Sequence, residues 1–76
     1  MPKISPISYK KLAKIFELEG FKLEREKGSH LIYIKEGVSR PVVIPKYDEI
    51  PVFVIKNNLR SAKISRDRYL ELLKRV

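Results

Sequence analysis

Apolar residues near the start of the chain recur at the spacing of one helix face. They lie within the segment from Tyr9 to Glu19, and they are Leu12, Ala13, Ile15 and Phe16. Positions three and four residues apart share one side of an α-helix, so the segment is predicted to form an amphipathic helix. Ser8 before it is suited to cap the first turn through its hydroxyl. Gly20 after it suits the left-handed conformation in which many helices end.

The middle of the chain has the pattern of three short strands joined by turns. The expected strands are residues 21–26, 30–35 and 40–45, and the turns between them lie at 27–29 and 36–39. In the first strand, apolar Phe21 and Leu23 alternate with charged residues, which is typical of a half-buried strand. Pro41 lacks a backbone N–H and indicates that the third strand begins at a sheet edge. The short turns predict two consecutive hairpins and hence an antiparallel meander.

Helical spacing returns after a break at residues 46–51. The apolar residues with this spacing are Val52, Ile55, Leu59 and Ala62. Ser65 is suited to cap a last helix over residues 66–74, and its packing candidates are Tyr69, Leu70, Leu72 and Leu73. The order α-β-β-β-α-α predicts an α+β fold, with helices covering one face of a three-stranded antiparallel sheet. The other face is then free to meet a partner.

The size and composition of the chain narrow its function. With 76 residues, 43% of them apolar and 34% charged, it has the composition of one globular domain, expected to span residues 1–76. A nucleotide-binding fold with a separate substrate domain does not fit this length. The lack of cysteine excludes disulfide frameworks, thiolate zinc sites and cysteine nucleophiles. A single histidine excludes metal sites built from several histidines, and no cofactor is expected.

Positive charge is the first indication of a partner. The chain has 17 Lys and Arg against 9 Asp and Glu, a net charge of +8. This excess favours nucleic acid, an acidic membrane surface or an acidic protein, although it also serves solubility. Residues 1–27 carry seven basic and four acidic side chains, residues 28–55 three of each, and residues 56–76 seven and two. We therefore expect the positive charge on the helices and a neutral sheet between them.

The sequence gives no indication of a membrane-spanning segment or of a secretory signal. No stretch approaches the roughly 20 apolar residues of a membrane span. The first residues, 1–5, lack the apolar run of a secretory signal. We expect a cytoplasmic protein without a membrane partner.

Four short motifs together resemble one known family. They are Gly20-Phe21, Lys27-Gly28-Ser29-His30, Ile44-Pro45 and Glu49-Ile50-Pro51. With the α-β-β-β-α order, they resemble the HicA toxins, small mRNA interferases of bacterial and archaeal toxin–antitoxin pairs, from about residue 7 to residue 73. The resemblance implies a fold similar to a double-stranded RNA-binding domain and an endoribonuclease that cleaves mRNA and inhibits translation. It also implies that His30 is catalytic, and that a HicB-like antitoxin covers the face that holds it.

The chemistry of the residues near His30 suits RNA cleavage without a metal. Cleavage needs a base for the 2′-hydroxyl and an acid for the leaving oxygen, and an imidazole exchanges protons near neutral pH. A cation near the phosphate stabilises the transition state. The predicted substrate-binding residues are Lys27, Gly28, Ser29, Lys35, Arg40 and Lys46. The structural alternative is that Gly28 and Ser29 only form a turn and that the cations are solvated charges at strand ends.

Strand alternation and the neighbouring glycine turn predict different positions for His30. By strand alternation it shares a face with Ile32 and Ile34, which predicts the apolar face under the helices. Its position first in the strand, beside a glycine turn, allows a bulge that relaxes this rule. We expect His30 at the rim of the sheet, partly exposed.

The chain departs from the family pattern in having only one histidine. Many HicA toxins carry a second one directly after the third strand, where this chain has Pro45-Lys46-Tyr47. The second proton-transfer group is then a lysine, a tyrosine, a carboxylate or water. Two other functions are compatible with the sequence. One is a non-catalytic RNA-binding module, which needs neither His30 nor an antitoxin; the other is a protein-interaction adaptor that pairs with an acidic partner alone.

Overall fold

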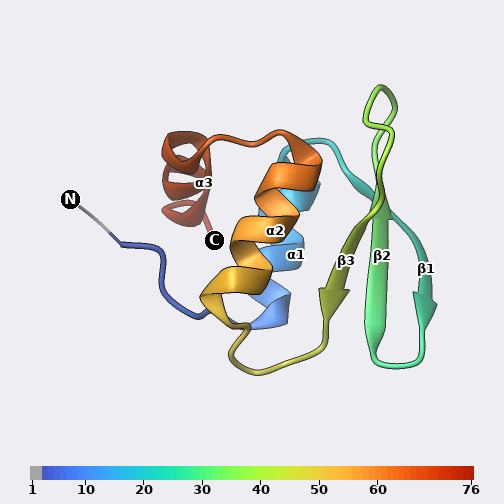
Figure 1. Ribbon diagram of the computed structural model, residues 1–76, viewed down its shortest axis with the longest axis horizontal. Coiled ribbons are helices and arrows are strands. Elements are labelled where there is room, and N and C mark those ends of the chain that lie inside the picture. The colour runs from blue at the N-terminus through green and yellow to red at the C-terminus, as the bar shows by residue number, and fades with distance from the viewer. Residues whose placement is uncertain (1–2) are drawn as a thin grey trace.

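The computed structural model describes residues 3–76 and has the predicted order of helices and strands (Figure 1). The elements are α1 (Tyr9–Leu18), β1 (Lys22–Lys27), β2 (His30–Ile34), β3 (Val42–Pro45), α2 (Val52–Ala62) and α3 (Arg66–Leu73). Each begins and ends within two residues of the predicted position. The α+β class is thereby confirmed.

Serine side chains cap the N-termini of two helices, as predicted. The Ser8 hydroxyl accepts a hydrogen bond from the Lys11 backbone N–H at 3.4 Å, and the Ser65 hydroxyl accepts one from that of Arg68 at 3.1 Å. Gly20 follows α1 with a φ of +93°, the left-handed conformation expected there. Within residues 3–76, no helix is long and apolar enough to cross a membrane.

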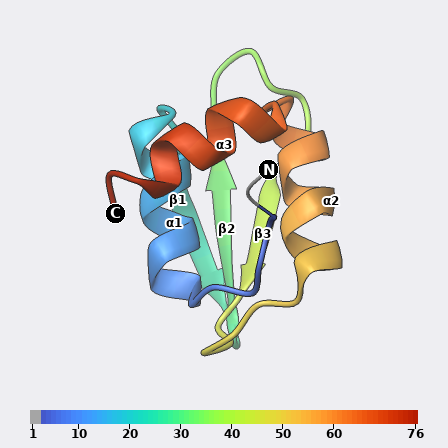
Figure 2. The same ribbon diagram turned by 90° about the vertical axis from the view of Figure 1, so that its left-hand side faces the viewer.

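The helices all lie on one side of the sheet. In Figure 2, α1 and α2 lie side by side in front of the three strands, and α3 crosses them on the side away from the sheet. The core lies between these layers. Its fully buried side chains include Leu12, Ile15, Phe16, Val42, Ile44, Ile55, Tyr69 and Leu72. Among the residues that the structure describes, no helix lies on the opposite face of the sheet (Figure 1).

The sheet is an antiparallel meander in the order β1-β2-β3. Both hairpins predicted from the short turns are confirmed, and β3 lies at an edge, as Pro41 indicated. Strand β1 pairs with β2 through a register shift between Leu23 and Arg25, which marks a β-bulge. Because Glu24 is the extra residue there, the side chains before and after it do not follow a simple alternation.

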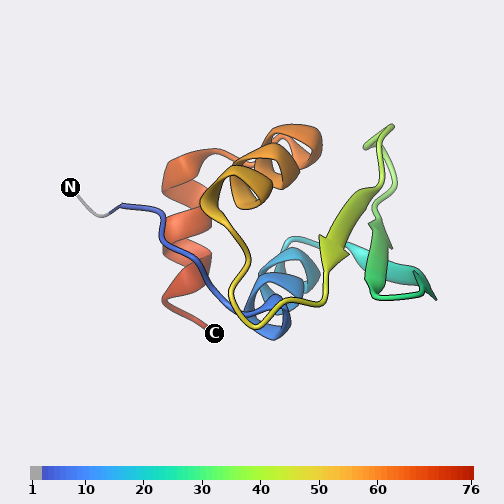
Figure 3. The same ribbon diagram turned by 60° about the horizontal axis from the view of Figure 1, so that its bottom comes forward.

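Strand β1 is exposed along its whole length, so the prediction of a half-buried strand is wrong. Phe21 is buried, but it lies just before the strand, with its ring packed edge-on against Phe16 at 5.3 Å between centroids. Leu23 is 49% exposed. The physical reason is visible in Figure 3, where β3 lies next to the helices and β1 is the strand farthest from them.

The chain before α1 braces the segment that follows β3. Ile7 and Ile50 form an isolated antiparallel bridge, in which the Ile50 N–H donates to the Ile7 carbonyl at 2.7 Å. The Tyr9 N–H donates to the Tyr47 carbonyl at 3.0 Å. These bonds hold residues 46–51 in place beside the end of the sheet where β2 begins.

Candidate active site

His30 is the first residue of β2 and is exposed on the open face of the sheet. Leu31 and Tyr33 belong to the core under the helices. Alternation along the strand therefore directs His30 and Ile32 to the other face. The prediction that alternation places His30 under the helices is wrong, because the strand turns its Leu31 and Tyr33 side to the core. No bulge at His30 is needed to expose it.

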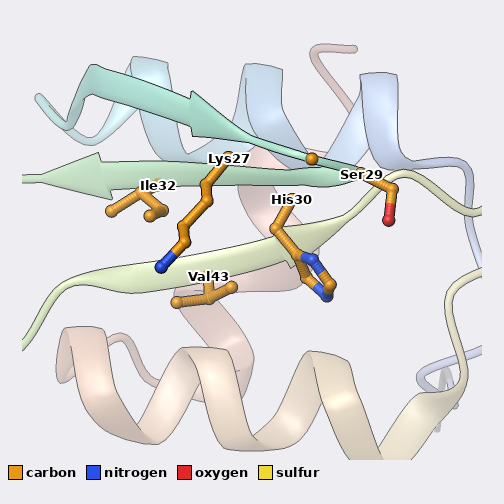
Figure 4. Close-up of a pocket in the computed structure, with 6 residues that line it drawn as sticks. Lys27, Ser29, His30, Ile32 and Val43 are labelled. Carbon is orange, nitrogen blue, oxygen red and sulfur yellow. The ribbon is translucent and has the colours of Figure 1, made fainter.

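The register of the sheet places Lys27 directly opposite His30. Lys27 is the last residue of β1, and Pro45 is the partner of His30 on β3. Residues paired across strands share a face of the sheet. Figure 4 shows Lys27 and His30 projecting on the same side, over the neighbouring strands. They line a shallow surface pocket with Gly28, Ser29, Ile32 and Val43.

The turn at the pocket combines a left-handed glycine with a backbone hydrogen bond to the segment after β3. Gly28 has a φ of +59°, which glycine adopts without the steric cost of a Cβ atom. A Cβ built at Gly28 would meet no heavy atom within 4 Å, so the backbone there is open to an approaching ligand. The Ser29 carbonyl accepts a hydrogen bond from the Lys46 N–H at 2.9 Å. This bond ties the turn to the braced segment after β3.

Three of the predicted substrate-binding cations lie outside this pocket. Lys46 is close through its backbone, but its ammonium group forms a salt bridge with the Glu26 carboxylate. Glu26 is paired with Leu31 and thus faces the helix side. Lys35 follows the far end of β2, where its ammonium lies 5.7 Å from the centre of the Phe21 ring. Arg40 precedes β3, whose first residue pairs near that same far end.

Tyr33 does not share the pocket with His30. Its hydroxyl donates a hydrogen bond to a Glu17 carboxylate oxygen at 2.9 Å on the helix side of the sheet. Burial, together with this hydrogen bond and the charge of Glu17, raises the pKa of Tyr33 to about 12. Besides His30, the side chains that line the pocket and carry exchangeable protons are those of Lys27 and Ser29. Within residues 3–76, no group of three or more His, Cys, Asp or Glu side chains is arranged to hold a metal ion.

Two further cations lie on the open face and were not predicted from the sequence. Lys22 pairs with Ile34, and Arg25 pairs with Ile32. Both therefore face the same side as His30. In a regular strand, residues 22 and 25 point to opposite faces, and it is the bulge at Glu24 that brings them together. The sequence pattern carries no signal for this bulge.

Comparison with known protein families gives a match. A family model described as HicA toxin of bacterial toxin–antitoxin systems matches residues 9–64, from the start of α1 to just beyond α2. The matched region contains the whole sheet and the pocket around His30. No match was found among curated proteins.

Proposed function

The chain belongs to the HicA toxin family, and from this premise we propose that it is an endoribonuclease that cleaves mRNA and inhibits translation, with His30 in acid–base catalysis. HicA toxins are known as ribonucleases and act within toxin–antitoxin systems. The observation that carries the proposal for this chain is the exposed His30 beside Lys27, in a pocket on the uncovered face of the sheet.

The pocket supplies the groups that a metal-free cleavage requires. His30 takes the proton of the ribose 2′-hydroxyl, whose oxygen then attacks the adjacent phosphorus. The bond from phosphorus to the 5′-oxygen breaks, and that oxygen takes a proton from water. The hydroxide that remains takes the proton held by His30, which restores the neutral imidazole. The products are a 2′,3′-cyclic phosphate and a 5′-hydroxyl end. Lys27 stabilises the charge that develops on the phosphate oxygens, and the open backbone at Gly28 with the Ser29 hydroxyl receives the same group.

The expected effect of His30 on the cleavage rate follows from the usual contribution of one positioned acid–base group. Such a group typically contributes about 10²–10⁴-fold to a rate. Tyr33 lies on the other face and Lys46 is held by Glu26. Since Lys27 is assigned to the phosphate, we propose water as the second proton-transfer partner of His30. We therefore expect slower cleavage than by nucleases that use two histidines.

The same face is the proposed docking site of an acidic, HicB-like antitoxin. Membership of a toxin family implies an antitoxin partner. Ile34 and Val43 are 40% and 41% exposed on the open face, and a partner covering them also covers His30. The net charge of +8 favours association with an acidic protein as well as with RNA.

The test compares RNA cleavage by the wild-type protein, His30→Ala and the control Ser39→Ala, each with and without excess EDTA. Ser39 is exposed in the loop before β3, away from the pocket. We expect wild type and Ser39→Ala to give 2′,3′-cyclic phosphate ends, detected by mass spectrometry, and His30→Ala to lose at least about 100-fold in rate. Added imidazole should partly restore His30→Ala, because the pocket is open to solvent.

Each outcome has a definite meaning. Equal cleavage by wild type and His30→Ala removes His30 from the chemistry. Cleavage that EDTA abolishes contradicts the metal-free route. RNA binding without cleavage by any of the three proteins favours the non-catalytic RNA-binding module instead.

A further inference from the structure

Three cations of β1 form one row on the open face of the sheet. Lys22, Arg25 and Lys27 pair in register with Ile34, Ile32 and His30. These partners alternate along β2, so the row repeats about every 6.7 Å, twice the rise of one strand residue. All three cations are exposed. The prediction of a neutral sheet is therefore wrong for this face.

The cations of this row are available to a ligand. Within residues 3–76, neither Lys22 nor Lys27 makes an ion pair, and Arg25 has only a long contact of 3.9 Å with the Glu24 carboxylate. Both side chains of that contact are largely exposed, at 64% and 47%. Such surface pairs contribute little stability, so the guanidinium is readily recruited by an anion.

An apolar row runs beside the cations along β2. Ile32 and Ile34 follow His30 on the open face, and Val43 of β3 lies opposite Ile32. The row connects two surface hollows. One is the pocket around His30. The other lies at the far end of β2, where Lys22 and Ile34 line it with Gly20, Lys35 and Glu36.

From these two parallel rows we infer that the open face is a binding track for single-stranded RNA that leads to His30. The inference rests on the proposed ribonuclease function and adds the form of RNA and the residues that hold it. Successive phosphates lie against Lys22, Arg25 and Lys27, since an extended strand repeats its charge at a similar spacing. The bases lie against Ile34 and Val43, which are 40% and 41% exposed, and thereby place one phosphate beside His30.

The geometry favours a single strand over a duplex. A duplex hides its bases in the stack and presents two phosphate backbones across its minor groove. The open face has one row of cations and, next to it, an apolar row that unpaired bases are able to contact. A charged groove along the backbone with apolar contacts to the bases is the general arrangement of single-strand binders. The regular spacing of the cations favours a polymer with regular charge over an acidic protein.

The experiment measures RNA binding by fluorescence anisotropy in proteins that all carry His30→Ala, so that cleavage does not interfere. The probes are a short unstructured RNA and the same sequence annealed as a duplex. The track variant is Lys22→Gln/Arg25→Gln. The matched control is Lys10→Gln/Lys11→Gln on α1, which loses the same charge from two exposed positions.

We expect the track variant to bind the single strand about tenfold more weakly. The slope of log Kd against log salt should fall by about 1.4, since two phosphate contacts are lost at about 0.7 each for single strands. The control should change affinity by about twofold or less, because its charges are distant and screened. A third variant, Ile34→Thr, should weaken binding with an unchanged salt slope, since the contact that it removes is uncharged.

Any of three results would contradict the proposed RNA-binding track. These are equal or tighter binding of the duplex, an equal loss in the α1 control, or unchanged RNA binding in the Lys22→Gln/Arg25→Gln protein. If the Lys22→Gln/Arg25→Gln protein binds RNA normally but no longer binds the antitoxin, the row of cations is a protein interface. Failure of the proposed function is distinguishable: full cleavage by His30→Ala would remove the catalytic role of His30 while leaving these binding results intact.

Discussion

The two edge strands of the sheet differ in nearly every physical respect. Val42 and Ile44 of β3 are fully buried under the helices. All six residues of β1 are exposed, and Leu23 is the one apolar residue among them. Strand β3 therefore contributes to stability through packing, whereas β1 is held mainly by its backbone pairing with β2. Because β1 does not pack against the helices, it carries charged side chains that would be unfavourable in a buried strand.

Strand β2 lies between these edges and divides its residues between both roles. Leu31 and Tyr33 pack into the core with β3 and the helices. His30, Ile32 and Ile34 face the other side, beside the cations of β1. The folding core and the candidate site therefore share one strand but use opposite faces of it. Mutations on the two faces should then separate stability from activity.

The largest expected effect comes from matched isoleucines on the two faces. Ile44→Ala in β3 removes a fully buried side chain and should lower the free energy of unfolding by about 2–5 kcal/mol. Ile34→Ala in β2 removes a side chain that is 40% exposed and should cost less than about 1.5 kcal/mol. Urea denaturation followed by circular dichroism measures both. Equal losses would show that the open face is packed against something in the folded protein.

The next effect is a loss of stability at high pH on the helix side. Burial is the main cause that raises the pKa of both Tyr33 and Tyr69 to about 12 from 10. The folded state keeps these protons where the unfolded state releases them, so stability is full below pH 10 and is lost as the pH rises toward 12. Each pKa unit corresponds to about 1.4 kcal/mol.

Unfolding in urea at a series of pH values measures this loss. The control is the double variant Tyr33→Phe/Tyr69→Phe, in which lysine titration remains and the tyrosine contribution disappears. If the double variant loses as much stability between pH 10 and pH 12 as the wild type, the two tyrosines are not its cause.

Much of the fold was predictable because local and long-range signals agree. Ser8 and Ser65 cap helices whose apolar faces are already regular in sequence, and Gly20 ends the first one. Because the turns are short, the strands that they join pair as hairpins. The exposure of β1 was not predictable from alternation alone. It depends on how far the helices extend over the sheet, which is a property of the packed structure.

The candidate site was predictable only where its residues are adjacent in the chain. Residues 27–30 lie together in one turn and line one pocket. Lys35 and Arg40 were expected there, but antiparallel pairing carries them to the other end of the strands. Lys46 is near, yet its ion pair with Glu26 turns its charge away. Such side-chain pairing and register are set in three dimensions and leave no one-dimensional pattern.

A smaller effect is expected at Gly28, on the exposed side. Its φ of +59° is strained for alanine, although a Cβ has open space around it. Gly28→Ala should therefore cost about 1–2 kcal/mol through backbone strain alone, and Gly28→Asn should cost less, because asparagine tolerates this conformation better. Thermal unfolding measures the stability of both. If Gly28→Asn keeps its stability but loses RNA cleavage, the glycine is needed for close approach of the phosphate.

The smallest effect is expected for the hydroxyl of Tyr69. It is buried and has no hydrogen-bond partner within residues 3–76, whereas the Tyr33 hydroxyl donates to Glu17. Tyr69→Phe removes a polar group whose burial is uncompensated, so stability should stay the same or rise by up to about 1 kcal/mol. Tyr33→Phe removes a satisfied bond and should lower it by about 1 kcal/mol. Urea denaturation of the two variants gives the sign of each change. A clear loss for Tyr69→Phe would mean that its hydroxyl is solvated in solution, and that the helix side is less tightly closed than its contrast with β1 implies.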